Sequence, residues 1–194
     1  MKTIFITGAS SGIGRETAKF FAAKGWRVIA TMRNLKILAE YDVDVLLNNA
    51  GYGIMAPFER IPEAEIRKLF ETDVFGTMFV TQEFIPHFKA RRSGAILTTT
   101  SLAAIIGLPR DGAYGAAKRA QQGMVESLYY ELKPFNVFVK AMIPGGTKTN
   151  FQTPLNDLTG YEKNCGESAQ ISFGGQCRIS RRHRSRANYF HGGD

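Results

Sequence analysis

The sequence has little cysteine and no long hydrophobic run. Cys165 and Cys177 are its only cysteines among 194 residues, so a framework of several disulfides is excluded. No stretch reaches the run of about 18 apolar residues that a membrane-spanning helix needs, and the chain starts without the pattern of a secretory signal. We therefore expect a cytoplasmic protein that has no membrane partner.

Metal-ligand patterns are also missing. The late cysteines and histidines do not have the paired spacing that is typical of a zinc site; they are Cys165, Cys177, His183 and His191. We predict no metal site.

Acidic residues are outnumbered by basic ones, and the formal net charge is +8. Half of this excess lies in residues 172–194, which contain five arginines and one aspartate. No nucleic-acid motif or basic helix face accompanies the charge, which favours solvation or attraction of an anionic cofactor. We predict no nucleic-acid partner, and we keep salt-sensitive nucleic-acid binding through residues 172–194 as an alternative.

A glycine-rich turn between an expected strand and an expected helix is the feature around which the chain is organised. The apolar β-branched run at residues 3–7 leads into Gly8, Gly12 and Gly14, and an amphipathic stretch follows. Glycines let the backbone approach a pyrophosphate, whose charge the free N–H groups at a helix start can bind. This context predicts a dinucleotide site, and a glycine-rich turn without a ligand is the alternative.

Strands and helices alternate along the first 150 residues. The expected strands cover residues 3–7, 26–31, 43–48, 94–101 and 136–143, and the expected helices cover residues 15–24, 63–91 and 112–132. In the last helix an apolar stripe runs through Ala116, Ala120, Met124, Leu128 and Leu132. The alternation predicts an α/β fold with a Rossmann-type doubly wound parallel sheet in three layers. Residues 1–150 form the expected dinucleotide-binding and catalytic domain, and residues 151–194 form an atypical C-terminal segment.

Five motifs in this order resemble the short-chain dehydrogenase/reductase family. They are TGASSGIG at residues 7–14, NNAG at residues 48–51, Ser101, Tyr114-x-x-x-Lys118, and Pro144-Gly145 with Thr149. The resemblance implies a Rossmann-type fold, an NAD or NADP cofactor, and hydride transfer to or from a carbonyl or alcohol carbon. The expected partner is therefore a small carbonyl or alcohol substrate.

Tyr114 and Lys118 are the residues with acid and base chemistry. Their i, i+4 spacing places both side chains on one face of a helix. A phenol with a pKa of about 10 exchanges protons poorly at neutral pH until a nearby ammonium favours the phenolate, and Lys118 supplies that charge. The resemblance implies that Lys118 also binds the nicotinamide ribose, that Ser101 holds the substrate oxygen and that Tyr114 moves the proton. For the pair alone, an ordinary solvated helix face is the alternative.

Cofactor contacts follow from the resemblance, residue by residue. Asn49 and Gly51 would lie near the adenosine ribose, and Thr149 would reach the diphosphate or carboxamide. The full expected set is Gly8, Ser10, Ser11, Gly12, Ile13, Gly14, Arg33, Asn49, Ala50, Gly51, Tyr114, Lys118, Pro144, Gly145, Thr147 and Thr149.

The end of the second strand indicates which dinucleotide is preferred. Residues 31–34 read TMRN and contain no carboxylate for the ribose 2′-OH of NAD. An arginine suits the 2′-phosphate of NADP, so Arg33, helped by Arg15, predicts that NADP(H) is preferred over NAD(H). A surface arginine near a sheet end is the alternative.

Three departures from the family pattern bear on activity. Asp73 stands where the family usually has asparagine, and its charge would favour the Lys118 cation while opposing phenolate formation at Tyr114. Only residues 34–42 connect two expected strands, whereas a parallel crossover generally needs a dozen or more residues. Residues 172–194 lack periodicity, and we expect them to be poorly ordered, as the product of a shifted reading frame or an alternative terminal segment. The third and last strands of the family sheet are therefore expected to be missing.

These observations favour an NADP(H)-dependent oxidoreductase that interconverts a carbonyl and a secondary alcohol. The catalytic candidates are Ser101, Tyr114 and Lys118, with Asp73 in place of the usual asparagine. The alternative is a truncated, inactive homologue that binds nucleotide weakly or acts as an interaction subunit. Because the family often dimerises through helices that correspond to residues 63–91 and 112–132, a homodimer or homotetramer is also expected.

Overall fold

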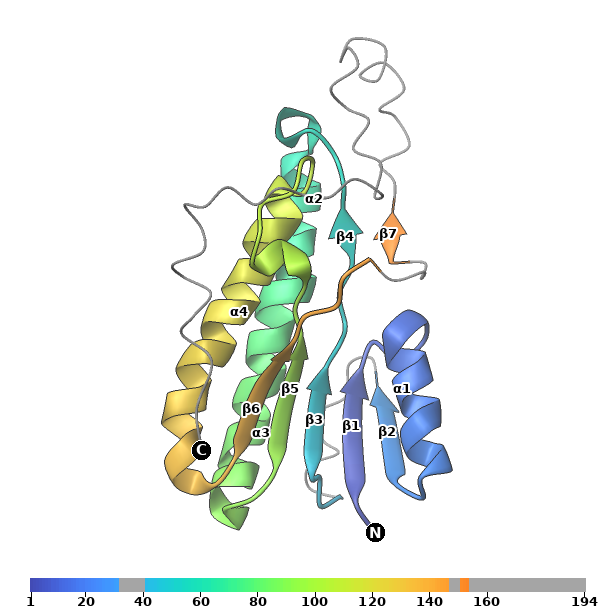
Figure 1. The fold of residues 1–194 in the computed structure, drawn as a ribbon, viewed down its shortest axis with the longest axis vertical. Helices are drawn as coiled ribbons and strands as arrows, with labels where there is room; N and C mark the ends of the chain where they lie inside the picture. Colours follow the sequence, from blue (N-terminus) through green and yellow to red (C-terminus); the bar gives the residue numbers. More distant parts are fainter. Residues whose placement is uncertain (32–40, 147–150, 154–194) are drawn as a thin grey trace. The chain divides into compact units, whose positions relative to one another are not determined.

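Five parallel strands form the main sheet, in the order β2-β1-β3-β5-β6 (Figure 1). The computed structural model describes residues 1–31, 41–146 and 151–153. The strands are β1 (Thr3–Thr7), β2 (Arg27–Thr31), β3 (Val45–Asn48), β5 (Ala95–Thr99) and β6 (Phe138–Met142). The parallel pairing confirms the predicted Rossmann-type sheet.

Four α-helices connect or flank these strands. Helix α1 covers Gly12–Ala23, α2 covers Glu63–Phe70, α3 covers Gly76–Arg91 and α4 covers Gly112–Leu132. The helix predicted at residues 63–91 is present but changes its geometry midway, where Glu71–Phe75 is π-helical. Pro86 lies inside α3.

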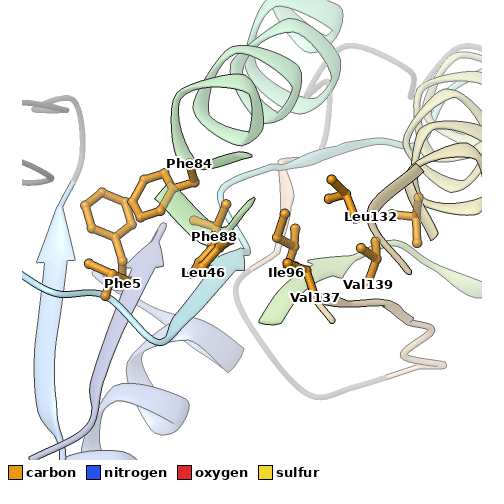
Figure 2. Packing of buried hydrophobic residues seen from close by; sticks show 10 residues of the cluster. Phe5, Leu46, Phe84, Phe88, Ile96, Leu132, Val137 and Val139 are labelled. Carbon is orange, nitrogen blue, oxygen red and sulfur yellow. The ribbon is translucent and has the colours of Figure 1, made fainter. Parts of the chain in front are cut away.

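One row of apolar side chains crosses the main sheet toward α3 and α4. The strand register aligns Phe5 with Leu46, Leu46 with Ile96, and Ile96 with Val139. These four residues belong to one buried cluster with Phe84 and other side chains of α3 and α4 (Figure 2). The cluster fixes the two helices on this face of the sheet, and so it determines where their polar side chains lie.

The opposite face of the sheet packs against α1. Ile4, Ile6 and Leu47 are buried there with Phe21 of α1 and Trp26 beside them. Side chains of consecutive strand residues point to opposite faces, which is why Phe5 belongs to one cluster and Ile4 and Ile6 to the other. Helices on both faces give the three layers that the sequence predicts.

In the part of the chain that the structure describes, β2 and β6 are the edges of the main sheet. Among these residues no further strand pairs with either edge of the main sheet. The shortened connection predicted at residues 34–42 lies mostly outside the described residues, as do residues 172–194. None of the helices among residues 1–31, 41–146 and 151–153 combines the length and hydrophobicity that crossing a bilayer requires.

Two features differ from the prediction. A second, two-stranded parallel sheet pairs β4 (Gly53–Ile54) with β7 (Gln152–Thr153), which the sequence did not predict. The predicted apolar stripe of α4 is wrong at Ala116, which is exposed. Polar residues, including Lys118 and Gln121, take buried positions on this helix instead.

Replacing Phe84 with alanine tests the packing of the core. Its ring is fully buried between Phe5, at 4.9 Å between ring centroids, and Phe88, at 6.0 Å. We expect Phe84→Ala to lower the free energy of unfolding by about 3–5 kcal/mol, because the substitution leaves a cavity. Urea denaturation measures the change, with Phe79→Ala on the same helix as the control. Phe79 is 58% exposed, so equal losses for the two variants would contradict the assignment of the core.

Candidate active site

The candidate residues collect at the carboxyl ends of the parallel strands. Gly8 follows β1, Asn49 follows β3 and Ser101 lies two residues after the end of β5. In the sheet, β2 lies on one side of β1, whereas β3, β5 and β6 lie on the other side. The order therefore reverses between β1 and β3, and open α/β sheets bind ligands outside the strand ends at such a reversal.

In the glycine-rich turn, Gly8 packs closely against Ala50, and no Ser11 side chain caps the N–H donors at the start of α1. Gly8 has a positive φ of 65°, and a Cβ atom on it would lie 2.6 Å from the Cα of Ala50. Ser11 precedes α1 in an extended conformation and makes no side-chain cap hydrogen bond. The first-turn N–H groups of α1 can therefore be used by an anion, as the dinucleotide prediction requires. Ser10 and Ser11 are exposed at the same turn.

Asn49 ties this turn to the neighbouring strands. Its Nδ2 donates to the backbone oxygens of Thr7, at 3.3 Å, and Gly8, at 3.1 Å, and its Oδ1 accepts from Thr99 Oγ1 at 3.3 Å. The backbone N–H groups of Asn49 and Ala50 donate to Thr7 Oγ1 at 2.9 and 3.0 Å. The amide of Asn49 is thus engaged with protein groups that fix the turn.

Ser101 and Tyr114 come together although 12 residues separate them. The hydroxyl of Ser101 is close enough to Tyr114 to lower the pKa of its phenol by hydrogen bonding, and it accepts from the N–H of Ala103 at 3.2 Å. The N–H of Leu102 donates to the carbonyl of Pro144 at 3.2 Å, which joins the end of β5 to the segment after β6. Tyr114 is only 8% exposed, and its ring packs edge-on against Phe151 at 5.6 Å. The structure therefore brings the predicted Ser101, Tyr114 and Pro144 into one region.

Lys118 and Asp73 form a buried ion pair beside Tyr114. Their Nζ and Oδ2 atoms are 3.1 Å apart, and the side chains are 3% and 0% exposed. The Lys118 Nζ lies 5.6 Å from the centroid of the Tyr114 ring. A charge this deeply buried is stable only when it is paired, so each residue depends on the other.

The π-helical segment Glu71–Phe75 positions Asp73. The backbone carbonyl of Asp73 accepts from Thr77 Oγ1 at 2.8 Å and from Gln121 Nε2 at 2.5 Å. The Oδ1 atom of Asp73 accepts from the N–H of Tyr52 at 3.1 Å. Single π-helical turns inside α-helices often occur at functional sites. Here the turn directs both the backbone and the side chain of Asp73 into the region of Tyr114 and Lys118.

Burial dominates the acid–base properties of these three residues. It raises the pKa of Tyr114 to about 12; the hydrogen bond with Ser101 opposes this rise, and the charges of Asp73 and Asp111 add to it. Burial also raises the pKa of Asp73 and lowers the pKa of Lys118, while the attraction between the two charges opposes both shifts. The direction for Tyr114 differs from the expectation that Lys118 favours the phenolate, because burial raises this pKa most and the charge of Asp73 adds to the rise.

Several predicted cofactor residues lie outside the described residues; they are Arg33, Thr147 and Thr149. The structure adds Gln121, Thr77 and Phe151, which the sequence reading missed. Gln121 follows Lys118 by three residues and Tyr114 by seven, so it shares their helix face, and this spacing was the available signal. Among the described residues no cluster of three or more histidine, cysteine or carboxylate side chains could hold a metal ion.

Comparisons with known proteins point to one family. The family model described as short chain dehydrogenase matches residues 2–42 and 36–159, two segments that overlap at residues 36–42, between β2 and β3. Retinol dehydrogenase 8 of Homo sapiens is 32% identical over 191 residues. That match covers 79% of this chain and 61% of the relative, so the chain spans less than two thirds of that protein's length.

Solved structures agree with this match. A short-chain dehydrogenase from Streptomyces avermitilis superposes with a TM-score of 0.76 at 30% identity, covering 84% of this chain and 74% of that one. A Beutenbergia cavernae protein, described as an NAD(P)-dependent gluconate 5-dehydrogenase and solved with NADP bound at low occupancy, superposes with a TM-score of 0.70 at 27% identity. The second superposition covers 77% of this chain and 74% of the other.

Replacing Lys118 with methionine tests the buried ion pair. The variant leaves the Asp73 carboxylate without its cation, and we expect a loss of about 3–5 kcal/mol in the free energy of unfolding at pH 8. Without Lys118, burial raises the pKa of Asp73 against the hydrogen bond from the Tyr52 N–H alone, so the folded state takes up a proton as the pH falls toward the ordinary carboxyl range. The loss should therefore be smaller at pH 5 than at pH 8, as measured by urea denaturation against the wild type.

The double variant Asp73→Asn/Lys118→Met is the control for this prediction. Because it removes both charges, it should lose less stability than the two single variants together. A loss for Lys118→Met that does not change with pH would contradict a buried, charged Asp73.

Proposed function

Because the chain belongs to the short chain dehydrogenase family, we propose that it is an NADP(H)-dependent oxidoreductase that interconverts a carbonyl and a secondary alcohol, with Tyr114 as acid and base. One observation supports this most strongly. Ser101 and Tyr114, from different elements, lie close enough for Ser101 to lower the pKa of the Tyr114 phenol, and Lys118 lies one helical turn from Tyr114. This is the set of groups that proton transfer to a substrate oxygen requires.

A nicotinamide cofactor would supply the hydride. The glycine-rich turn fits such a group, because the Ser11 side chain does not cap the N–H groups in the first turn of α1, which can then bind an anion. In this proposal the N–H groups of Gly12, Ile13 and Gly14 bind the pyrophosphate. Lys118, Pro144, Gly145, Thr147 and Thr149 would lie along the nicotinamide half.

The preference for NADP(H) rests on Arg33. Residues 31–34 provide this arginine and no carboxylate, which favours a 2′-phosphate over a free 2′-OH. Arg15 adds a side chain that is 56% exposed at the start of α1. The Beutenbergia cavernae neighbour, with NADP bound, is consistent with this preference.

The chain's own residues would divide the proton chemistry between them. Ser101 orients the substrate oxygen, and Tyr114 donates a proton to that oxygen during reduction or accepts one during oxidation. With a pKa of about 12, Tyr114 is protonated at neutral pH. The site is therefore prepared to act as an acid, and we propose that carbonyl reduction is its favoured direction near pH 7.

Replacing Tyr114 with phenylalanine tests the proposal. The variant keeps the ring and removes the hydroxyl that moves the proton. We expect turnover of NADPH with a panel of carbonyl compounds to fall by about a hundredfold to ten-thousandfold. Loss of NADPH absorbance measures it, and unchanged turnover in Tyr114→Phe would refute the role of Tyr114.

Tyr130→Phe is the matched control, because Tyr130 lies on the same helix and is 70% exposed. Nucleotide binding is measured separately, since a ligand that binds only the folded state raises the melting temperature. NADPH should raise it more than NADH does, and Arg33→Ala should remove the difference. An NADPH-dependent rise without turnover on any carbonyl would favour the alternative of an inactive, nucleotide-binding homologue.

The pH dependence of the two directions gives a second test. Below pH 12 the phenol of Tyr114 is mostly protonated, so the phenolate fraction rises about tenfold per pH unit. We expect alcohol oxidation with NADP⁺ to increase steeply between pH 7 and pH 9, whereas carbonyl reduction changes little over this range. Initial rates in the two directions measure this, and an oxidation rate that levels off below pH 8 would contradict the raised pKa.

A further inference from the structure

Gln121 is a buried polar side chain that contacts both members of the ion pair. It lies one helical turn after Lys118 and is 2% exposed. Its Oε1 accepts from Lys118 Nζ at 2.9 Å, and its Nε2 donates to the carbonyl of Asp73 at 2.5 Å and to Thr77 Oγ1 at 2.8 Å. An ammonium only donates and a carbonyl only accepts, so these partners fix the orientation of the amide.

Gln121 also supplies one of three protein oxygens around the Lys118 ammonium. An ammonium has three N–H donors and no acceptor. Lys118 Nζ donates to Gln121 Oε1 at 2.9 Å and to the carbonyl of Thr99 at 3.3 Å, and Asp73 Oδ2, its ion-pair partner, lies 3.1 Å away. A further acceptor must therefore compete with these oxygens for the ammonium.

We propose that Gln121 is a positioning residue that holds the Lys118 ammonium against Asp73 and thereby competes with the cofactor for that ammonium. The competition rests on the proposed function, in which Lys118 binds the nicotinamide ribose. A ribose hydroxyl must compete with these protein oxygens for the ammonium. Gln121 makes the shortest of the three contacts with Lys118 and also contacts the backbone carbonyl of its ion-pair partner Asp73.

Two substitutions with side chains about as long as glutamine separate the contact with Lys118 from the contacts with Asp73 and Thr77. Gln121→Met removes the acceptor for Lys118 and the donor for Asp73 and Thr77. Gln121→Glu also removes the donor but keeps an acceptor for Lys118 and adds a negative charge. Both variants therefore lose the hydrogen bonds to Asp73 and Thr77. They differ in whether the side chain at position 121 can accept a hydrogen bond from Lys118.

Nitrogen-15 NMR of the Lys118 ammonium tests the positioning in the full chain without nucleotide. Buried and hydrogen-bonded N–H groups exchange slowly with water. We expect exchange at the Lys118 ammonium to be at least about tenfold faster in Gln121→Met, and to remain slow in Gln121→Glu. Equal exchange in the wild type and Gln121→Met would overturn the positioning role.

Titration of NADPH fluorescence then tests the competition. We expect Gln121→Met to bind NADPH about tenfold more tightly than the wild type, because one donor of Lys118 has been released, and Gln121→Glu to bind more weakly. A residue that only supports the fold would lower the melting temperature of both variants without moving the two dissociation constants in opposite directions. Shifts in the same direction, or no shift, would overturn the competition.

The two measurements also distinguish this inference from the proposed function. If no variant binds NADPH, the proposed function and the competition both fail, and the exchange of the Lys118 ammonium still decides the positioning role. Gln122→Met is the control, because the adjacent amide donates to Glu126 Oε1 at 2.9 Å on the exposed side of the helix. It should change neither the exchange of Lys118 nor the binding of NADPH.

Discussion

The buried ion pair of Lys118 and Asp73 is the interaction on which the rest of the site depends. Neither charge is stable alone in a region with almost no access to water. Asp73 reaches Lys118 from a π-helical turn, and Lys118 projects from α4, so the pair requires the two helices to meet in one arrangement. Gln121 reinforces that arrangement by bonding to both residues. A chain that formed the sheet but placed these helices differently would leave two charges unpaired.

The sheet explains why residues far apart in the sequence gather at one edge. Parallel strands end on the same side, so Gly8, Asn49 and Ser101 are brought together by strand pairing. The aligned row from Phe5 to Val139 then supports α3 and α4 from beneath, with Phe84 packed into it. The apolar core thus determines the position of the polar site.

Features that local sequence determines could be predicted, and features that depend on packing could not. The strand Thr3–Thr7 and the helix Gly112–Leu132 have the predicted bounds, because an apolar run and its turn signals are local. The spacing of Gln121 from Lys118 and Tyr114 indicates their shared helix face, but its partners Asp73 and Thr77 depend on α3 and the π-helical turn lying opposite it. The pairing of β4 with β7 joins segments about a hundred residues apart, and each contributes only two residues.

Asp73 illustrates how one group can favour the fold and also change the acid–base properties of a neighbouring side chain. As the partner of Lys118 it makes a buried ammonium possible, yet its charge adds to the rise in the pKa of Tyr114. A neutral residue at this position would remove that repulsion and leave the lysine without its counter-charge. The carboxylate therefore adds to the effect of burial, which is the main reason that Tyr114 keeps its proton. In the proposed function, this suits a residue that gives a proton to a carbonyl oxygen more than one that takes it from an alcohol.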